Sequence, residues 1–475
     1  MNNRKSILKT GLKLSMILAL AISSQSEVSA ADWLSLQAVE PDFVAPQGVL
    51  VPNRNKVPKV WGFLQFNYRQ DLGNVVIGTN SPNTGINQTP FSLLQPDLTD
   101  QSGFNLFRAR LGVRGMADDD NLVDYFILTD FGNNGVGNPN GKKEVGNYIT
   151  DASITLRHIP GATIRAGMFK TPGSEEGLGS VYYYPYVEFS TFTDQQLLER
   201  TMKRAGVAET GSAAGGATSV HYTGVASDPV GAFRDTGIEI YDTFHINKDW
   251  TASYAYMLGN GSGISLSSSN DQQTHYGYLA LEKSFGGGKG YNTNAFKMYG
   301  WLQDGKRTLL VDKDNNASTT PYDKKTYNRQ RSGVGISYYN DGLRLETEYA
   351  MAKGMIFTGA KDTNNDPAID DWALQYAVGD ENKAYGGYIN AQYYVIPDKL
   401  ELISRYDWMN RLTNSVAGRR EFKTTTLGFS YHFKDATRLD FNYAIKSARA
   451  PNNNGAQTTL DNTGDRVSLQ LTAGF

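Results

Sequence analysis

The chain closes on a run, residues 466–475, in which apolar and polar side chains alternate. One face carries Val467, Leu469, Leu471, Ala473 and Phe475, and the other carries Ser468, Gln470, Thr472 and Gly474. A period of two residues predicts a β-strand with one apolar and one polar side.

Similar runs recur from residue 58 onwards. Across residues 343–351, Leu345 and Tyr349 share one face, while Arg344, Glu346 and Glu348 share the other; residues 250–258 and 439–445 follow the same pattern. We count about eighteen such runs. Sixteen remain if the two weakest, 205–211 and 219–226, belong to loops. A barrel with both ends on the same side of a membrane needs an even number of strands.

The connections between the runs are alternately short and long. Seven tight turns rich in Gly, Pro, Asn or Asp lie at 118–121, 159–161, 247–249, 286–288, 340–342, 397–399 and 434–436. The long, polar connections are 71–103, 133–146, 171–201, 260–272, 304–328, 355–383, 411–421 and 448–463. This asymmetry predicts an all-β transmembrane antiparallel β-barrel of 16–18 strands, with short periplasmic turns and long extracellular loops. Aromatic residues near the turns, such as Trp250, Tyr393 and Phe433, fit the aromatic belt of a membrane interface.

The N-terminal residues predict export. Four basic residues precede a short apolar run at 14–22, and Val28-Ser29-Ala30 resembles a signal-peptidase site. We therefore expect a signal peptide at 1–30, a proline-rich periplasmic leader at 31–57 and the barrel at 58–475. No apolar stretch of the roughly 18 residues needed for a membrane helix follows the leader.

Composition narrows the function classes. The chain has no cysteine, which excludes disulfides and cysteine-ligated metals or haem. Removing residues 1–30 takes away four basic residues and one acidic residue, leaving 42 basic and 47 acidic residues, a net charge of −5. No basic stripe suited to nucleic acid is present, so any anion preference must be local.

Four segments carry a family resemblance: FRARLGVRG at 107–115, DFG at 130–132, RAGMFKTP at 165–172 and ER at 199–200. Together they resemble the phosphate-selective porin O and P family of Gram-negative outer membranes. The resemblance implies a trimeric porin of sixteen strands, whose water-filled pore is narrowed by an infolded loop and lined by a ladder of arginines that conducts anions. This chain departs from the family in its acidic balance, in Gly173 after Pro172, and in its acidic candidate loop.

Arginines on the inward faces are the candidate pore residues. Strand parity places Arg108, Arg110 and Arg114 opposite Phe107, Ala109, Leu111 and Val113, and it also turns Arg69, Arg157 and Arg165 inward. Permanently charged guanidinium groups lower the barrier for anions in a narrow pore. We expect these six to guide anions. The alternative is that they pair with lumen carboxylates such as Asp124, Asp130 and Asp151 and only stiffen the wall.

The connection after the fifth strand is long enough to fold into the barrel. Its candidate constriction residues are Lys170, Glu175, Glu176, Tyr182, Tyr183, Tyr184 and Glu188. The tyrosines offer either a rim on which sugars stack or packing against the wall, and packing is the commoner role.

Signs of other chemistry are weak. Residues 362–366 have calcium-like oxygen spacing but lack the turn glycine and the closing glutamate. No Gly-x-Ser-x-Gly elbow occurs, residues 300–307 end in Arg307 where a phosphate loop needs Ser or Thr, and the five histidines lack metal spacing. We expect no enzyme, metal or cofactor.

The sequence thus predicts an outer-membrane porin for small hydrophilic solutes, anion-preferring and homotrimeric. Its expected partners are outer-membrane lipid, lipopolysaccharide and small anionic solutes, with no nucleic acid. A second hypothesis is a structural barrel, acting as a scaffold for a partner such as a cytochrome or as a surface adhesin.

Overall fold

The computed structural model describes residues 58–73, 102–120, 122–132, 134, 148–198, 233–264, 272–288, 290–312, 322–356, 381–433, 437–454, 457, 460–461 and 463–475. The expected signal peptide and leader lie outside these residues and stay predictions. So do the two weakest expected strands, 205–211 and 219–226, the calcium-like segment 362–366, and the ER pair at 199–200.

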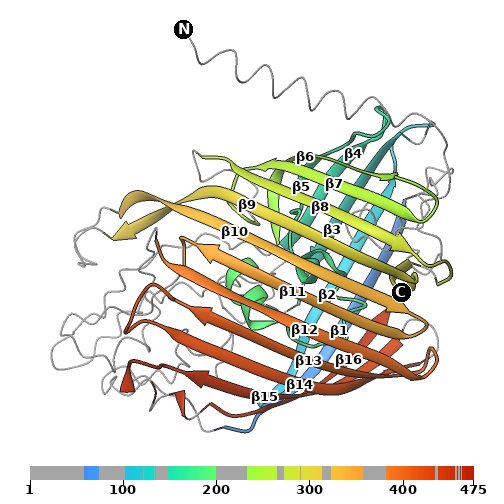
Figure 1. Ribbon diagram of the computed structural model, residues 1–475. Helices are drawn as coiled ribbons and strands as arrows, with labels where there is room; N and C mark the ends of the chain where they lie inside the picture. The colour runs from blue at the N-terminus through green and yellow to red at the C-terminus, as the bar shows by residue number, and fades with distance from the viewer. Residues whose placement is uncertain are drawn as a thin grey trace.

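Sixteen strands in the described part form one closed antiparallel barrel, in which neighbours in the sheet are neighbours in the chain (Figure 1). Their bounds are β1 Lys59–Asp71, β2 Ser102–Met116, β3 Val123–Asp130, β4 Tyr148–Leu156, β5 Thr163–Lys170, β6 Arg234–His245, β7 Trp250–Gly259, β8 Thr274–Ser284, β9 Ala295–Asp312, β10 Tyr322–Asn340, β11 Leu343–Lys353, β12 Lys383–Ile396, β13 Leu400–Arg411, β14 Arg420–His432, β15 Thr437–Arg449 and β16 Arg466–Gly474. The helical elements are α3 Glu175–Leu178, the π-helical turn η2 Thr193–Leu198 and the short 3-10 turn η3 Gly290–Asn292.

The alternation in the sequence is the alternation of the barrel wall. On β11, Leu345, Tyr349 and Met351 are exposed on the outside, whereas Arg344 and Glu348 are buried inside. The predicted faces of this strand are therefore confirmed. Within the described residues, no helix is long and apolar enough to cross a membrane.

The two ends of the barrel differ as expected. Predicted tight turns join β2–β3, β4–β5, β6–β7, β10–β11 and β12–β13 at one end, which we call the turn end. At the same end β8 and β9 are joined by ten residues, 285–294, which include η3, and the predicted turn 434–436 between β14 and β15 lies outside the described residues. At the β10–β11 turn, Asp341 and Gly342 both have positive φ (45° and 89°), which suits Asp and Gly better than other residues. The strand ends that the other connections join lie at the opposite end, which we call the loop end.

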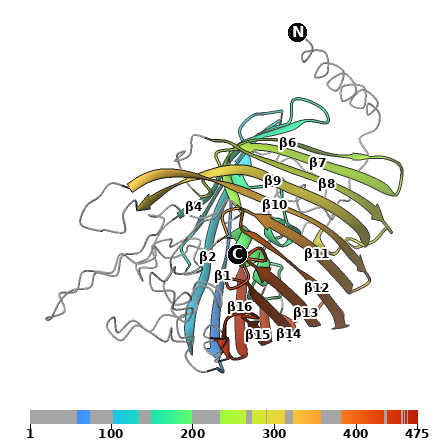
Figure 2. The same cartoon turned by 60° about the vertical axis from the view of Figure 1, so that its left-hand side comes forward.

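The first and last strands close the sheet. β1 pairs with β16 from Phe63–Gly474 to Asp71–Arg466, and Figure 2 shows the two strands side by side. The Gly62 N–H donates to the Phe475 carbonyl (2.9 Å) and the Phe475 N–H donates to the Gly62 carbonyl (3.0 Å). A Cβ at position 62 would lie 2.6 Å from the Phe475 ring, so glycine is required there. The predicted pairing of the closing strand is confirmed.

Two sequence predictions are wrong in detail. The expected loop 304–328 is largely strand, because β9 and β10 pair from Gly305–Arg329 to Asp312–Tyr322 and extend past their neighbours at the loop end (Figure 1). A strand that leaves the membrane has no lipid face, so it loses the apolar alternation by which strands are recognised.

Phe107 was assigned to the outward face, and it is buried at 1% exposure. The pairing of β1 with β2 shifts register between Gln65 and Phe66, where Gln65 pairs with Arg108 and Phe66 pairs with Leu106. Phe107 lies at this bulge, which turns its ring inward. The guanidinium groups of Arg69 and Arg108 then lie 4.2 and 4.3 Å from the ring centre.

Candidate functional site

The segment that follows β5 folds into the barrel. Residues 171–198, which we call the infolded loop, contain α3 and η2 and lie inside the wall behind β11 and β12 in Figure 1. Leu178, Ser190, Phe192, Asp194 and Leu197 are each at most 3% exposed. The loop is therefore a packed part of the barrel interior.

The loop begins with a local clamp. The Lys170 ammonium at the end of β5 donates to the carbonyls of Leu178 (3.1 Å) and Gly179 (2.8 Å). These carbonyls end the single turn of α3, so a cation stabilises its C-terminus. Lys170 thus shapes the start of the infolded loop.

A buried carboxylate on β11 holds the start of α3. Glu348 accepts hydrogen bonds from the Ser174 hydroxyl (3.0 Å) and the Glu175 N–H (3.2 Å). It also accepts bonds from three wall residues, Tyr299 (3.0 Å), Trp301 (2.9 Å) and Tyr388 (3.0 Å). Five donors on one carboxyl group satisfy its buried oxygens and tie the loop to β9, β11 and β12.

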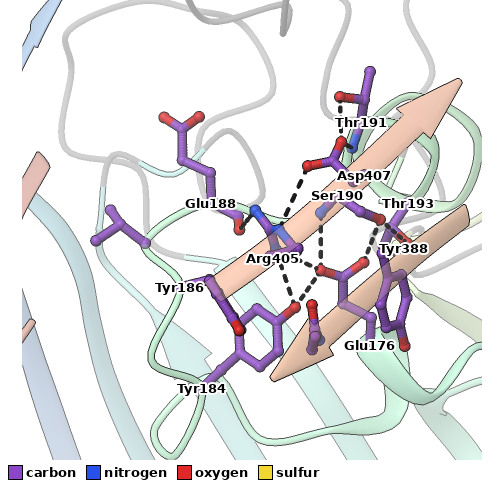
Figure 3. Close-up of polar contacts among 12 residues, drawn as sticks. Glu176, Tyr184, Tyr186, Glu188, Ser190, Thr191, Thr193, Tyr388, Arg405 and Asp407 are labelled. Carbon is purple, nitrogen blue, oxygen red and sulfur yellow. Dashed lines mark hydrogen bonds and ion pairs between the residues drawn. The ribbon is translucent and has the colours of Figure 1, made fainter. Parts of the chain in front are cut away.

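The centre of the loop is held by an ion pair with β13 (Figure 3). The Arg405 guanidinium lies 3.1 Å from the Glu176 carboxylate, and both side chains are at most 3% exposed. Glu176 also accepts bonds from the Ser190 N–H (2.8 Å) and hydroxyl (2.5 Å) and from the Tyr184 hydroxyl. Burial and this carboxylate raise the pKa of Tyr184 well above its usual value, so its hydroxyl remains a donor.

Arg405 spans the width of the loop. It donates to the Tyr184 hydroxyl (3.1 Å) and the Glu188 carbonyl (2.9 Å), and its guanidinium lies 4.6 Å from the centre of the Tyr186 ring. Its neighbour on the inward face, Asp407, accepts bonds from the Thr191 N–H (3.0 Å) and hydroxyl (2.8 Å). β13 therefore helps to hold the second half of the loop, together with β15, where Asn442 accepts from the Val187 N–H (2.8 Å).

The three acidic residues expected at the constriction all have cationic partners. Glu175 contacts Lys297, and Glu176 contacts Arg405. Glu188 lies 2.5 Å from Arg466 and 3.5 Å from Arg69. The acidic character of the loop, which departs from the resembled family, is therefore offset by the wall.

The expected tyrosines pack against one another and the wall. Tyr182 meets Phe63 (ring centres 5.5 Å apart) and Tyr183 (5.0 Å), and Tyr183 stacks on Tyr291 (5.6 Å). Tyr184 contacts Phe189 (6.0 Å). These contacts correspond to packing against the wall, one of the two expected roles, and Tyr182, Tyr183 and Tyr184 remain partly exposed.

The six expected arginines take three kinds of partner. Four face carboxylates: Arg110 with Asp130 (2.9 Å), Arg157 with Asp124 (2.6 Å), Arg165 with Glu239 (3.7 Å) and Arg69 with Glu188 (3.5 Å). Arg69 shares Glu188 with Arg466. Arg108 donates to the Gln65 side chain (2.7 Å), and Arg114 lies 4.7 Å from the Phe126 ring centre.

Four cations border one cavity between the loop and the β2–β6 wall. They are Arg108, Arg110, Lys170 and Arg234, and Asn134, Phe189 and Leu198 also line the cavity. Arg110 pairs with Asp130 and Arg234 pairs with Asp151 (2.9 Å each). Within the described part of the chain, the side chains that line this cavity include four basic residues and no Asp or Glu.

A second cleft separates the loop from β13–β16. Its empty space of about 630 Å³, part of it open to solvent, is lined by Glu188 and Thr191 of the loop and by Arg405, Lys446 and Arg466 of the wall. The rest of the lining is mixed, because Thr424, Thr426, Asn442 and Ser468 are polar, whereas Phe189, Phe422, Ala444 and Ala448 are apolar. A small polar solute would meet both hydrogen-bonding groups and apolar side chains here.

Sequence reasoning missed three arginines of the wall: Arg405 and Arg466, which pair with loop residues, and Arg234, which borders the cavity beside the loop. Arg234, Arg405 and Arg466 were not candidates, although parity could have turned each inward. On β13, for example, Glu401, Arg405 and Asp407 alternate with exposed Leu402 and Tyr406. No group of three or more His, Cys, Asp or Glu side chains in the described part is placed to hold a metal ion.

No protein-family model matches the chain, and no curated protein matches its sequence. Similar solved structures include Salmonella typhi OmpF in complex with daunomycin, at 14% identity over 90% of this chain and 99% of the other, with a TM-score of 0.49. The outer membrane channel DcaP of Acinetobacter baumannii has 11% identity over 88% and 97%, with a TM-score of 0.47. An anion-selective porin from Comamonas acidovorans has 12% identity over 88% and 99%, also with a TM-score of 0.47.

Proposed function

We propose that this chain is an outer-membrane porin, a water-filled channel for passive diffusion of small hydrophilic solutes with a preference for anions. The observation that carries the proposal is the infolded loop, held inside a closed sixteen-stranded barrel by the Glu176–Arg405 pair. A loop anchored at this depth narrows the lumen at a fixed place.

The outer surface supports a membrane location. Leu64, Leu279, Val334, Ile389 and Leu402 are between 45% and 68% exposed on the outside of different strands. Such a surface is stable against lipid and unfavourable in water. A homotrimer and contact with outer-membrane lipid complete the proposal.

The local charge supports an anion preference. Four basic side chains, Arg108, Arg110, Lys170 and Arg234, border the cavity, and two of them pair with carboxylates, Arg110 with Asp130 and Arg234 with Asp151. Arginine and lysine rings favour anions in pores. Phosphate is one candidate anion, as the sequence resemblance implies, and chloride is the simplest test anion.

The decisive experiment is conductance of the purified protein in a planar bilayer under a KCl gradient. We expect stepwise openings and a reversal potential that shows chloride permeating faster than potassium. Addition of phosphate should reduce the chloride current if phosphate occupies the cationic cavity.

The same recordings can overturn each part separately. Absence of any stepwise conductance would refute the channel, and co-purification of a partner with such a closed barrel would favour the scaffold hypothesis. Potassium selectivity would refute the anion preference and leave the channel. Native mass spectrometry in detergent tests the trimer.

A further inference from the structure

Basic side chains gather on the outside of β11–β15 at the loop end. We call Lys353, Lys383, Lys423 and Arg449 the basic rim. Lys353 and Lys383 are paired across β11 and β12. On β14, Lys423 lies between Trp408 of β13 and Ser447 of β15, and Arg449 pairs with Glu421. Their strand neighbours Ala352, Ala384, Phe422 and Ala448 are buried inside, so the rim faces outward.

The rim lies at the height expected for headgroups. Tyr393, at the turn end of β12, shares the outer face with Lys383 and lies ten residues further along the chain. Ten residues span about 33 Å of strand, or about 25 Å along the membrane normal at a tilt of about 40°. This is the height of the apolar band of an outer-membrane barrel.

The surface between these two levels is apolar and then aromatic. Ile389 and Leu427 are 53% and 48% exposed in the middle of the face. Closer to the rim, Trp408 lies opposite Lys423 and stacks with Tyr406 (ring centres 5.8 Å apart), and Tyr385 lies opposite Met351, two residues from Lys353. Lipid acyl chains would contact the apolar zone, and the membrane–water interface would lie at the aromatic zone.

Charge at the rim is unbalanced. The carboxylates that face it from β14 and from the residues before β12 are Glu421, 2.8 Å from Arg419, and Glu381, 3.0 Å from Lys353. Five cations, with Arg419 included, thus meet two carboxylates in the described part of this face. Lysines placed directly opposite each other also repel. At the turn end, by contrast, Lys248 and Lys399 each adjoin an aspartate in the sequence.

We propose that the basic rim binds the phosphate groups of a phosphorylated glycolipid in the outer leaflet, whose acyl chains lie on the apolar face below. Phosphates supply the negative charge that the rim lacks, and lysine and arginine bind them through charge-assisted hydrogen bonds. The inference is independent of the channel, because these side chains point away from the lumen. It rests on the proposed outer-membrane location, with the loop end facing the outer leaflet.

The test uses the purified full-length protein in detergent and bis-phosphorylated lipid A as the probe, with bound lipid counted by native mass spectrometry. The triple variant Lys383→Gln, Lys423→Gln, Arg449→Gln should bind lipid A about 100-fold more weakly, at about fivefold per cation. The matched control, Lys248→Gln with Lys399→Gln at the turn end, should bind like the wild type. A second variant, Lys383→Arg with Lys423→Arg, keeps the charge and should retain binding.

Several results would overturn the proposal. They are unchanged binding by the triple variant, an equal loss in the turn-end control, and equally tight binding of phosphatidylglycerol. Conversion of the triple variant to a monomer would instead assign the face to a subunit contact. Bilayer conductance should be the same in all of these variants, so failure here leaves the proposed channel untouched.

Discussion

Removing Arg405 is the sharpest test of how the infolded loop is held. In Arg405→Ala, Glu176 keeps three hydrogen-bond donors but loses its cation, and Asp407 and the Glu188 carbonyl each lose a contact. Breaking one side of a buried ion pair typically costs about 3–5 kcal/mol. If the loop alone bears that loss, its undocked fraction rises about a thousandfold, since about 1.4 kcal/mol corresponds to a factor of ten.

Limited proteolysis and conductance measure this undocking. The loop contains Tyr182, Tyr183 and Phe189 but no lysine or arginine, so chymotrypsin is the suitable protease. We expect chymotrypsin to cut folded Arg405→Ala in the loop under conditions that leave the wild type intact. Single channels of the variant should be noisier and larger.

Two further variants control the experiment. Arg419→Ala removes a half-exposed pair with Glu421, which is worth at most about 1 kcal/mol, and should leave the loop protected. Glu176→Gln keeps the acceptor for Ser190 while removing the charge, and should give an intermediate effect. The reasoning fails if Arg405→Ala resists chymotrypsin as the wild type does and its conductance is unchanged.

Three other outcomes follow from the structure. The double variant Arg110→Gln, Arg234→Gln should shift the reversal potential toward that of potassium, because Asp130 and Asp151 lose their cationic partners. The control Arg157→Gln removes a pair with Asp124 nearer the turn end and should shift the reversal potential less. Gly167→Ala should lower the free energy of unfolding, measured in denaturant, by at least the roughly 1–3 kcal/mol of a strained backbone, because the residue has a φ of 129° and a Cβ would lie 2.1 Å from a carbonyl oxygen. Gly161→Ala should cost less, because Gly161 has a positive φ (75°) but open space around it. Although desolvation opposes the shift, hydrogen bonds from the Leu122 and Val123 N–H groups lower the pKa of Asp118. The carboxylate therefore stabilises the fold above its unfolded-state pKa, and this stabilisation disappears as the pH falls through its folded-state pKa. Asp118→Asn should flatten the acid side of the profile of unfolding free energy against pH, and an unchanged profile would contradict this.

Much of the barrel could be predicted because lipid imposes a simple rule on each strand. Parity alone placed Arg69 and Arg344 inside and Leu345 outside, and turn residues located the hairpins. The rule fails where its cause is absent. β9 and β10 extend beyond the membrane without an apolar face, and one bulged residue in β2 turned Phe107 inward.

The interior contacts could not be predicted in the same way. Glu176 and Arg405 are 229 residues apart, and Glu188 and Arg466 are 278 apart. Periodicity tells which way a side chain points, but not which distant side chain it meets. The candidate loop was identified by its length and place, whereas its partners depend on how deeply it enters the barrel.

The seam between β1 and β16 has a consequence for how this chain reaches its native state. Asp71 and Arg466 form a bidentate pair across the seam at a separation of 395 residues. Closing a flexible loop of that length costs about 5 kcal/mol of chain entropy, and the bonds that repay it form only when the final strand is present. Until then β1 is an open edge that neither lipid nor a neighbour satisfies. A chain that has lost β16 should therefore stay unassembled or aggregate, instead of forming a smaller barrel.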